Sequence, residues 1–246
     1  MEIIEISGKR FVIERLLCKN KNATAKLRNE KIIINIPSRW PLSEREKISA
    51  DLLKRAVNSI ENGRWNVNAG KKIEFSHGQR LIVLGKEFEI SFVQSERFGV
   101  KIVGRKVEVK INDHPDKNQI VAKLIRKKIG AILMPELTQR VSELNEKHFK
   151  SEISCIKIRD AVSRWGSCTT TGVISLNFRL LLMPPDILDY VIVHELAHTK
   201  YRSHGPRFWN LVGDVIPDHK LRRSWLRKNG WSSNNLTTVE PLEEPY

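Results

Sequence analysis

The segment His194-Glu195-Leu196-Ala197-His198 has the residue types and the spacing of a metal-assisted hydrolytic site. On an α-helix, residues four apart lie on nearly the same face, so both imidazoles can reach one metal ion. In this H-E-x-x-H pattern the two histidines bind zinc, and the glutamate takes a proton from the water on the metal, whose pKa zinc lowers to about 7. The segment therefore predicts zinc-dependent hydrolysis, with Glu195 as the general base.

A catalytic zinc usually has three protein ligands, so one more is expected outside the motif. His204 is the best candidate, because the glutamates that follow His198 are confined to the terminal tail. Asp214, Asp218 and His219 stay open as alternatives further along the chain. The histidine spacing matches that of metzincins, but Tyr201 stands where metzincins have glycine, and no methionine follows the motif. The pattern thus indicates a three-histidine zincin of another kind.

The motif needs a rigid helix, and the surrounding sequence predicts one. Pro184-Pro185-Asp186 is typical of a helix start, and an apolar helical pattern continues from Ile187 to Ala197. A long helical stretch is expected from Asp116 to about Lys147, with a kink or break at Pro135. Two strands, Cys155–Arg159 and Val173–Leu176, lie between the helices. A further helix should begin at Gly205-Pro206. Its residues expected in the protein core are Phe208, Trp209, Leu211 and Val212.

The first half of the chain is dominated by strand patterns. Strands are predicted over residues 31–36, 80–84, 87–92 and 107–111, the middle two flanking Gly85 as in a hairpin. One helix lies among them, with Ser43 as its cap, Glu46 completing a capping box and Gly63 ending it. No internal repeat is apparent. The fold class is therefore α+β: a β-rich N-terminal domain at 1–113, a zincin-like metallopeptidase domain at 114–231 and a disordered polar and acidic tail at 232–246.

Several short motifs occur in a fixed order around the histidines. They are Arg164-Trp165-Gly166-Ser167-Cys168, Ile174-Ser175-Leu176-Asn177, Pro184-Pro185, the run from Tyr190 to His198, then His204 and Phe208-Trp209. Over about residues 150 to 231 this order resembles the YgjP-like metallopeptidase family, which is similar to SprT-like proteases. The resemblance implies a minimal zincin fold, one zinc ion held by His194, His198 and His204, Glu195 as base, and a peptide or protein substrate. The similarity to SprT-like proteases also suggests a protease directed to proteins on DNA.

Net charge and cysteine content indicate which partners and which cellular compartment to expect. The formal net charge of +15 favours anionic partners and predicts weak nucleic-acid binding without sequence preference. Trp225 and Trp231 interleave with a basic cluster near residues 220–228 and could stack bases, although the blander interpretation is that they pack in the core. Cys18, Cys155 and Cys168 are too few and too scattered for a disulfide framework, and no apolar run is long enough to span a membrane. A cytoplasmic protein with no membrane partner is expected.

A metallopeptidase is the function predicted first, and two others stay open. The basic charge and a zinc ion would also suit a nucleotide phosphohydrolase of the pyrophosphatase type, or a nucleic-acid-associated protein with a structural zinc. Glu195 argues against the last, because a structural site needs no base. Candidates for substrate or oxyanion contacts are Arg164, Tyr190, Tyr201 and His219. The edge of the strand at Cys155–Arg159 is a candidate for pairing with an extended peptide.

Overall fold

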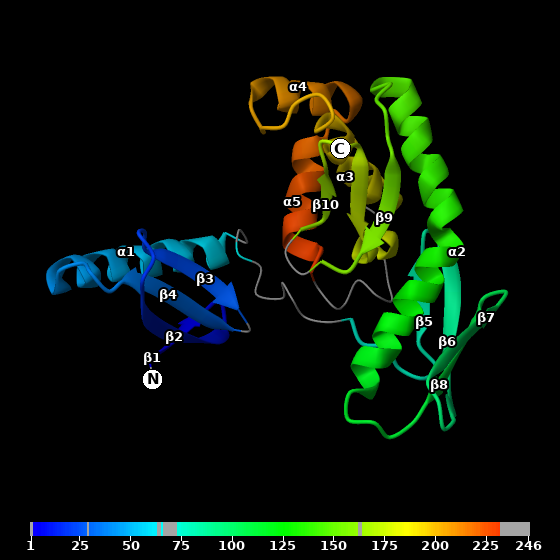
Figure 1. Ribbon diagram of the computed structural model, residues 1–246, viewed down its shortest axis with the longest axis horizontal. Helices are drawn as coiled ribbons and strands as arrows, with labels where there is room; N and C mark the ends of the chain where they lie inside the picture. The colour runs from blue at the N-terminus through cyan, green and yellow to red at the C-terminus, as the bar shows by residue number, and fades with distance from the viewer. Residues whose placement is uncertain (1, 29, 63–64, 66–72, 162–163, 232–246) are drawn as a thin grey trace. The chain divides into compact units, whose positions relative to one another are not determined.

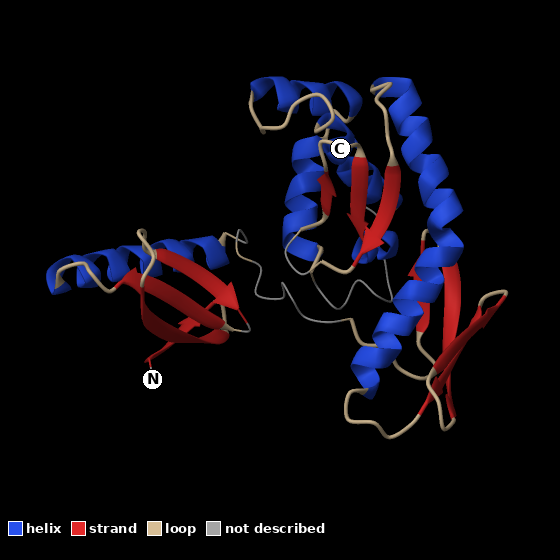
Figure 2. Cartoon of the chain, in the orientation of Figure 1, coloured by secondary structure: helices blue, strands red, loops and turns tan. Residues whose placement is uncertain are grey.

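The computed structural model describes residues 2–28, 30–62, 65, 73–161 and 164–231. Contacts within the chain divide it into two compact units, unit 1 (Met1–Lys71) and unit 2 (Lys72–Tyr246). Both units combine strands with helices (Figures 1 and 2), so the fold is mixed α+β, as the sequence predicted.

Unit 1 is a four-stranded sheet covered by one helix. The strands are β1 (Glu2–Ile6), β2 (Lys9–Cys18), β3 (Thr24–Arg28) and β4 (Lys31–Pro37), in the order β1-β2-β4-β3. β2 and β4 are parallel, and the other neighbours are antiparallel. Helix α1 (Leu42–Glu61) lies along the sheet in Figure 1 and adds Ala56 and Ile60 to a small core around Phe11.

The predicted capping box of α1 is not formed. The helix begins at Leu42 with Pro41 as its N-cap, and no side chain caps it. The carbonyl of Pro41 accepts the first helical hydrogen bond, from the amide of Arg45. Ser43 is therefore already inside the first turn, where its hydroxyl can no longer serve as the cap. Gly63, the predicted end, lies outside the described residues, and the helix ends at Glu61.

Unit 2 begins with a second four-stranded sheet. It contains β5 (Arg80–Val83), β6 (Lys86–Gln94), β7 (Gly99–Val103) and β8 (Lys106–Ile111), in the order β5-β6-β8-β7. Leu84 and Gly85 join β5 to β6 and both have positive φ, 49° and 72°. That conformation is required at both central positions of a type I′ hairpin turn, which confirms the hairpin predicted around Gly85.

The two sheets repeat one topology, which the sequence reading missed. In each, a hairpin is followed by a parallel pairing, an antiparallel pairing and then a helix. The hairpin turns match in detail, because Ser7 and Gly8 also have positive φ, 51° and 73°. The local sequence matches too, since Gly-Lys-x-Phe-x-Ile runs from Gly8 to Ile13 and again from Gly85 to Ile90. We call β1–β4 with α1 the first repeat and β5–β8 with α2 the second.

Helix α2 (Lys117–His148) connects the second repeat to the rest of unit 2. It packs against β7 and β8 near its start and against β9 and α3 further along (Figure 1). The sequence predicted a kink or break at Pro135, yet the helix continues through that residue. Leu133 and Leu137, on either side, are buried in the core. Packing on both sides of the proline therefore holds the helix together where one amide proton is missing.

The remaining elements surround the H-E-x-x-H segment. Three strands, β9 (Cys155–Arg159), β10 (Gly166–Cys168) and β11 (Val173–Asn177), form a sheet in the order β10-β11-β9. A 3-10 helix, η1 (Phe178–Leu182), leads into the helices α3 (Pro185–Ala197), α4 (Pro206–Val215) and α5 (His219–Asn229). Phe208 and Val212 of α4 are buried as predicted, while Trp209 and Leu211 are half-buried. Among the described residues, none of the helices has the length and apolar character that crossing a bilayer needs.

The compact units differ from the domain division expected from the pattern of strands and helices, which placed a boundary at residue 113. Buried residues of β5–β8, such as Phe88 and Val107, share one hydrophobic core with α2 and α3. The β-rich half of the sequence is therefore divided, with its first sheet in unit 1 and its second sheet in unit 2. A pattern of strands alone does not reveal which sheet shares a core with which helix.

Candidate metal centre

Helix α3 carries the first two histidines and the glutamate of the motif. Nine of the 13 residues of this helix are buried, including Val191, Ile192 and Leu196, so the surrounding core fixes its position. The helix begins at Pro185, as the sequence predicted. His194 lies in its last turn, and His198 is the C-cap with helical φ and ψ of −67° and −15°. The two imidazoles therefore project from the same face, one turn apart.

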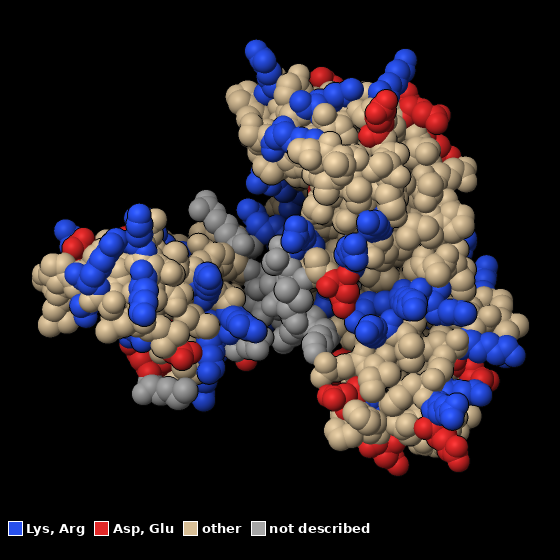
Figure 3. Space-filling view, in the orientation of Figure 1, with Lys and Arg blue, Asp and Glu red and all other residues tan. Residues whose placement is uncertain are grey.

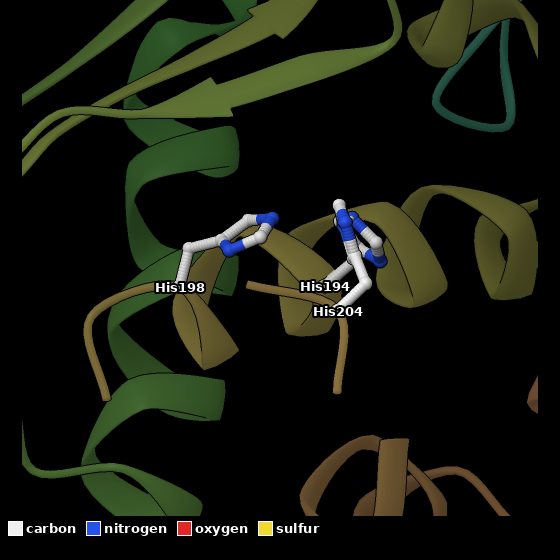
Figure 4. A group of neighbouring side chains, drawn as sticks. All are labelled: His194, His198 and His204. Carbon is white, nitrogen blue, oxygen red and sulfur yellow. Dashed lines mark hydrogen bonds between the residues drawn. The ribbon is translucent and has the colours of Figure 1, made fainter. Parts of the chain in front are cut away.

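His204, on the loop before α4, completes a cluster with His194 and His198. The ligand atoms of the three side chains lie within 4.8 Å of one another, and Figure 4 shows the rings gathered in one place. The Nε2 atoms of His194 and His204 are 3.0 Å apart. A tetrahedral zinc with Zn–N bonds of about 2.0–2.1 Å separates its ligand nitrogens by about 3.3 Å. Among the described residues, this triad is the group able to hold a metal ion.

The protonation of the histidines suits a metal. Burial, followed by the neighbouring His198, His204 and Arg223, lowers the pKa of His194 to about 3. Burial and the same kind of neighbours also lower the pKa of His204. The Nδ1 of His198 lies 3.1 Å from the carbonyl oxygen of Tyr201 and can donate to it, which leaves Nε2 as the acceptor. The Nε2 atoms of His194 and His204 are within hydrogen-bond distance, so without a cation one of them can donate to the other. If both neutral rings carry their proton on Nδ1 instead, both Nε2 lone pairs can bind one cation, so these residues fit a metal ion.

Glu195 is buried beside the cluster, with 5% of its surface exposed. Burial raises the pKa of Glu195 to about 8, while the charge of Arg164 opposes the shift. The carboxyl group fits there because residue 166 is glycine. A Cβ at Gly166 would lie 2.5 Å from Oε1 of Glu195, too close for any real contact. The Trp-Gly-Ser-Cys stretch of β10 therefore makes room for the acidic group of the motif.

The four residues predicted to contact the substrate or the oxyanion differ in burial and in their distance from the histidines. Tyr190 is buried one turn before His194, with ring centroids 6.1 Å apart, and burial raises the pKa of Tyr190 to about 12. Arg164 is exposed and acts electrostatically on Glu195. Tyr201 contributes its backbone carbonyl to His198, while its side chain is exposed. His219 is buried against Trp209, and its Nδ1 lies 3.2 Å from the carbonyl oxygen of Ile216.

The alternative third ligands lie outside the histidine cluster. Asp218 forms an ion pair with Arg222 at 2.9 Å, and Asp214 is exposed on α4. His219 does not contact the histidine cluster directly, because the ring of Trp209 lies between His219 and His204. The geometry therefore favours His204.

Three residues at the site were not predicted there. Trp209 was assigned to the core, yet its ring stacks on that of His204 with centroids 5.6 Å apart. Arg223 of α5 lies over the Trp209 ring, its guanidinium carbon 4.7 Å from the ring centroid. Gly166 is the third. In the sequence Arg223 is one of several basic residues in a run, and nothing distinguishes it from its neighbours.

The tryptophans considered for base stacking are packed instead. Trp231 is 6% exposed and packs on Trp165 in a tilted arrangement, with ring centroids 4.1 Å apart and the guanidinium of Arg179 over its ring. Trp225 is half-buried against the main core. Figure 3 shows lysine and arginine side chains spread over the visible faces of both units.

Comparison with known families decides the assignment. The model of the YgjP-like metallopeptidase domain matches residues 21–229. The chain belongs to the YgjP-like metallopeptidase family. As a member of that family it is a metallohydrolase, and the match extends from the metal centre into the first repeat.

Comparisons with individual proteins add less. Among solved structures, the chain is similar to the metallopeptidase zymogen abylysin of Pyrococcus abyssi, with 21% identity over 38% of this chain and 94% of the other and a TM-score of 0.35. It is also similar to the zymogen jannalysin of Methanocaldococcus jannaschii, with 22% identity over 37% and 92% of the chains and a TM-score of 0.32. Scores this low carry no argument about activity. No curated protein matches the chain.

Proposed function

We propose that this chain is a zinc-dependent peptidase that binds one zinc ion through His194, His198 and His204 and uses Glu195 as its general base. The observation that carries the proposal is the gathering of three imidazoles within 4.8 Å of one another, next to a buried carboxyl group. Family membership supports a metallopeptidase acting on peptide or protein substrates. The chemistry of the donor set supports zinc, since imidazole nitrogens at this spacing are its usual ligands.

Each residue has a distinct role in this proposal. When bound, zinc acts as a Lewis acid that lowers the pKa of water and polarises the scissile carbonyl. Glu195 accepts a proton at its carboxylate and later delivers it to the leaving amine. Burial favours the protonated form of Glu195, and the positive charge of a bound zinc would favour the carboxylate that accepts the proton. The hydrogen bond from His198 to the Tyr201 carbonyl orients that imidazole.

The substrate backbone would lie along β10 in this proposal. Both β9 and β10 are edges of the three-stranded sheet, and the sequence pointed to β9. β10 is the edge next to Glu195, through the close approach at Gly166. An extended peptide paired with β10 would bring its carbonyl groups toward the base and the histidines. Tyr190 stays protonated at neutral pH and is the candidate for a second oxyanion donor, because it lies one turn from His194.

The other functions considered from the sequence have less support. A nucleotide phosphohydrolase and a nucleic-acid-associated protein both drew on the net charge and a bound zinc ion, and the tryptophans among basic residues pointed to nucleic acid alone. Trp231 is buried, so it offers no face to a base. Weak, salt-dependent nucleic-acid binding and a cytoplasmic setting stay predictions.

Glu195→Gln tests the chemistry. Glutamine keeps the size of the side chain but accepts no proton, so zinc content and fold should be retained while peptide hydrolysis falls by about 10²–10⁴-fold. Zinc per chain and the cleavage of a peptide library are the two measurements. Glu146→Gln, an exposed position on α2, is the matched control and should change neither. A Glu195→Gln protein that holds zinc and cleaves at the parent rate would exclude this mechanism.

His204→Ala tests the ligand assignment. Losing a hydrogen-bonded neighbour of a ligand typically lowers metal affinity by about 10–100-fold, so losing a ligand itself should cost at least as much. The expected result is loss of most of the zinc, measured by elemental analysis after dialysis. His114→Ala, at an exposed position before α2, is the control and should keep one zinc per chain. Unchanged zinc in His204→Ala would return the role to Asp214, Asp218 or His219.

A further inference from the structure

Three arginines from three different segments lie around the metal centre. Arg164 precedes β10, Arg202 follows α3, and Arg223 belongs to α5. All three side chains are exposed. We call them the arginine rim.

Each member of the rim is tied to a residue of the site. Arg223 lies over the ring of Trp209, and Trp209 stacks on His204. One aromatic ring therefore connects the charge of Arg223 to a proposed metal ligand. Arg202 donates from Nη1 to the carbonyl oxygen of Cys168, at the end of β10, over 3.3 Å. The backbone of Arg164 is held by the buried Asn177, whose Nδ2 donates to the Arg164 carbonyl oxygen over 3.0 Å. These contacts position the guanidinium groups of Arg223 and Arg202 and the backbone of Arg164.

The rim has no acidic partner within the described part of unit 2. Other arginines of this unit pair with aspartates: Arg126 with Asp160, Arg140 with Asp189 and Arg222 with Asp218. No such ion pair occurs for Arg164, Arg202 or Arg223 among the described residues. Arg164 does act electrostatically on Glu195, but the proposed reaction requires that carboxyl group as its base. The rim therefore presents positive charge that the described residues leave uncompensated.

The chemistry of guanidinium groups indicates what this charge would bind. A guanidinium that lies over an aromatic ring keeps the N–H groups of its outer edge free in its own plane. That edge matches the two oxygens of a carboxylate, and charge-assisted pairs of this kind are stronger than neutral hydrogen bonds. A peptide lying along β10 would carry its side chains past Arg202 and Arg164, with Arg223 on the side of the histidines.

We propose that the arginine rim makes the enzyme selective for peptide segments that carry a carboxylate close to the scissile bond, either an acidic side chain or a free C-terminus. Arg223 is the specificity-determining residue, and Arg164 and Arg202 extend the same selection along β10. This inference rests on the proposed peptidase function, because it places the substrate at the histidine cluster.

Binding to a protein that cannot turn over its substrate tests the selection directly. The probes are three pools of short fluorescein-labelled peptides, identical except that Glu, Gln or Lys occupies each position in turn. Zinc-loaded, full-length Glu195→Gln protein is titrated, and fluorescence anisotropy gives the affinities. The Glu pool should bind about tenfold more tightly than the Gln pool, and the Lys pool more weakly than either. A fourth pool with blocked C-termini separates side-chain carboxylates from the terminal one.

The rim variants and their controls are made in the same background. Arg223→Gln should bring the Glu-to-Gln ratio close to one, and Arg223→Lys should restore part of it, because lysine keeps the charge but loses the planar fork. Arg105→Gln, which removes an exposed charge between β7 and β8, should keep the full ratio. The wild-type enzyme should show the same ranking in kcat/KM.

Two results of these titrations would overturn the proposed selectivity for carboxylates. Equal binding of the Glu and Gln pools, or the same ratio in Arg223→Gln as in Arg105→Gln, overturns the proposal. A single-stranded oligonucleotide that displaces the Glu pool and depends more strongly on Arg223 than the peptides do also overturns it, in favour of nucleic acid. If the wild type cleaves no pool, the proposed function fails, while the Glu-to-Gln binding ratio still decides the role of the rim.

Discussion

The two repeats share a topology, but they use it in different surroundings. The first repeat has its own small core, closed by α1 around Phe11 and Ile34. The second repeat has no core of its own, since Phe88 and Val109 belong to the hydrophobic cluster that also contains the motif helix. The difference follows from the helices: α1 ends after 20 residues, and α2 continues for 32 and reaches α3. The same arrangement of strands thus serves once as a separate unit and once as part of the catalytic core.

The two repeats also differ in what covers their surfaces. In the first repeat, an open groove of about 760 Å³ lies alongside α1, with Leu17 and Leu42 at its margin, 61% and 69% exposed. In the second repeat the β5–β6 hairpin contacts η1, and the amide of Leu84 donates to the carbonyl oxygen of Leu181. The larger core therefore covers the hairpin of the second repeat, although Ile82, Val93 and Val103 of the same repeat are exposed.

Phe11 and Phe88 occupy matching positions in the two repeats and give the strongest test of this comparison. Both side chains are buried, at 0% and 3% exposure. Truncating such a residue to alanine typically costs about 3–5 kcal/mol. We expect Phe88→Ala to lower the unfolding temperature of unit 2 and to release zinc at that lower temperature. Phe11→Ala should leave zinc release unchanged and destabilise unit 1 alone. Calorimetry combined with a zinc-sensitive dye follows both, and equal effects on zinc release would show that the repeats are not energetically separate.

The hairpin turns offer a smaller, matched test. Gly8 and Gly85 have φ of 73° and 72°, and a Cβ at either position would meet nothing within 4 Å. Replacement by alanine therefore adds only the backbone cost of a left-handed conformation, about 1–2 kcal/mol. Gly85→Ala should lower the stability of unit 2, and Gly8→Ala that of unit 1, by similar amounts in urea unfolding. A much larger loss in Gly85→Ala would mean that the contact with η1 amplifies the strain.

The ion pair between Arg140 and Asp189 should have the smallest effect. It joins the extension of α2 to α3, and the Nε of Arg140 donates to Oδ1 of Asp189 over 2.7 Å. The Arg140 side chain is 47% exposed, so solvent screening limits its contribution to about 0.2–1 kcal/mol. Arg140→Gln should therefore shift the unfolding of unit 2 slightly and leave unit 1 unaffected. A loss several times larger would show that the helix extension depends on this pair rather than on its buried leucines.

The metal centre was more predictable from the sequence than the division into units. The i, i+4 spacing of His194 and His198 translates directly into geometry, because helix periodicity needs no tertiary information. The position of His204 followed from elimination among downstream residues, and the cluster includes it. Its role as a ligand stays a proposal, with the tests given above.

What the sequence did not reveal depends on contacts between distant segments. Gly166 and Glu195 meet only because β10 lies against α3, and a three-residue strand carries almost no periodic pattern. Arg223 is one of many basic residues until Trp209 is seen beneath it. The sequence did not predict the repeat, because its two copies share little beyond Gly-Lys-x-Phe-x-Ile. Their hairpins are similar, and the rest of their sequences differ.

The hydrogen bond from Leu84 to Leu181 gives the second repeat a built-in reporter. An amide at the tip of a hairpin usually exchanges its proton with solvent quickly, because only local opening is needed. The Leu84 amide is bound to the segment that leads into the motif helix, so its exchange requires the hairpin and that segment to separate. Its deuterium uptake would therefore follow the opening of the catalytic core itself, and a slowing on zinc addition would register metal binding from a residue far along the chain.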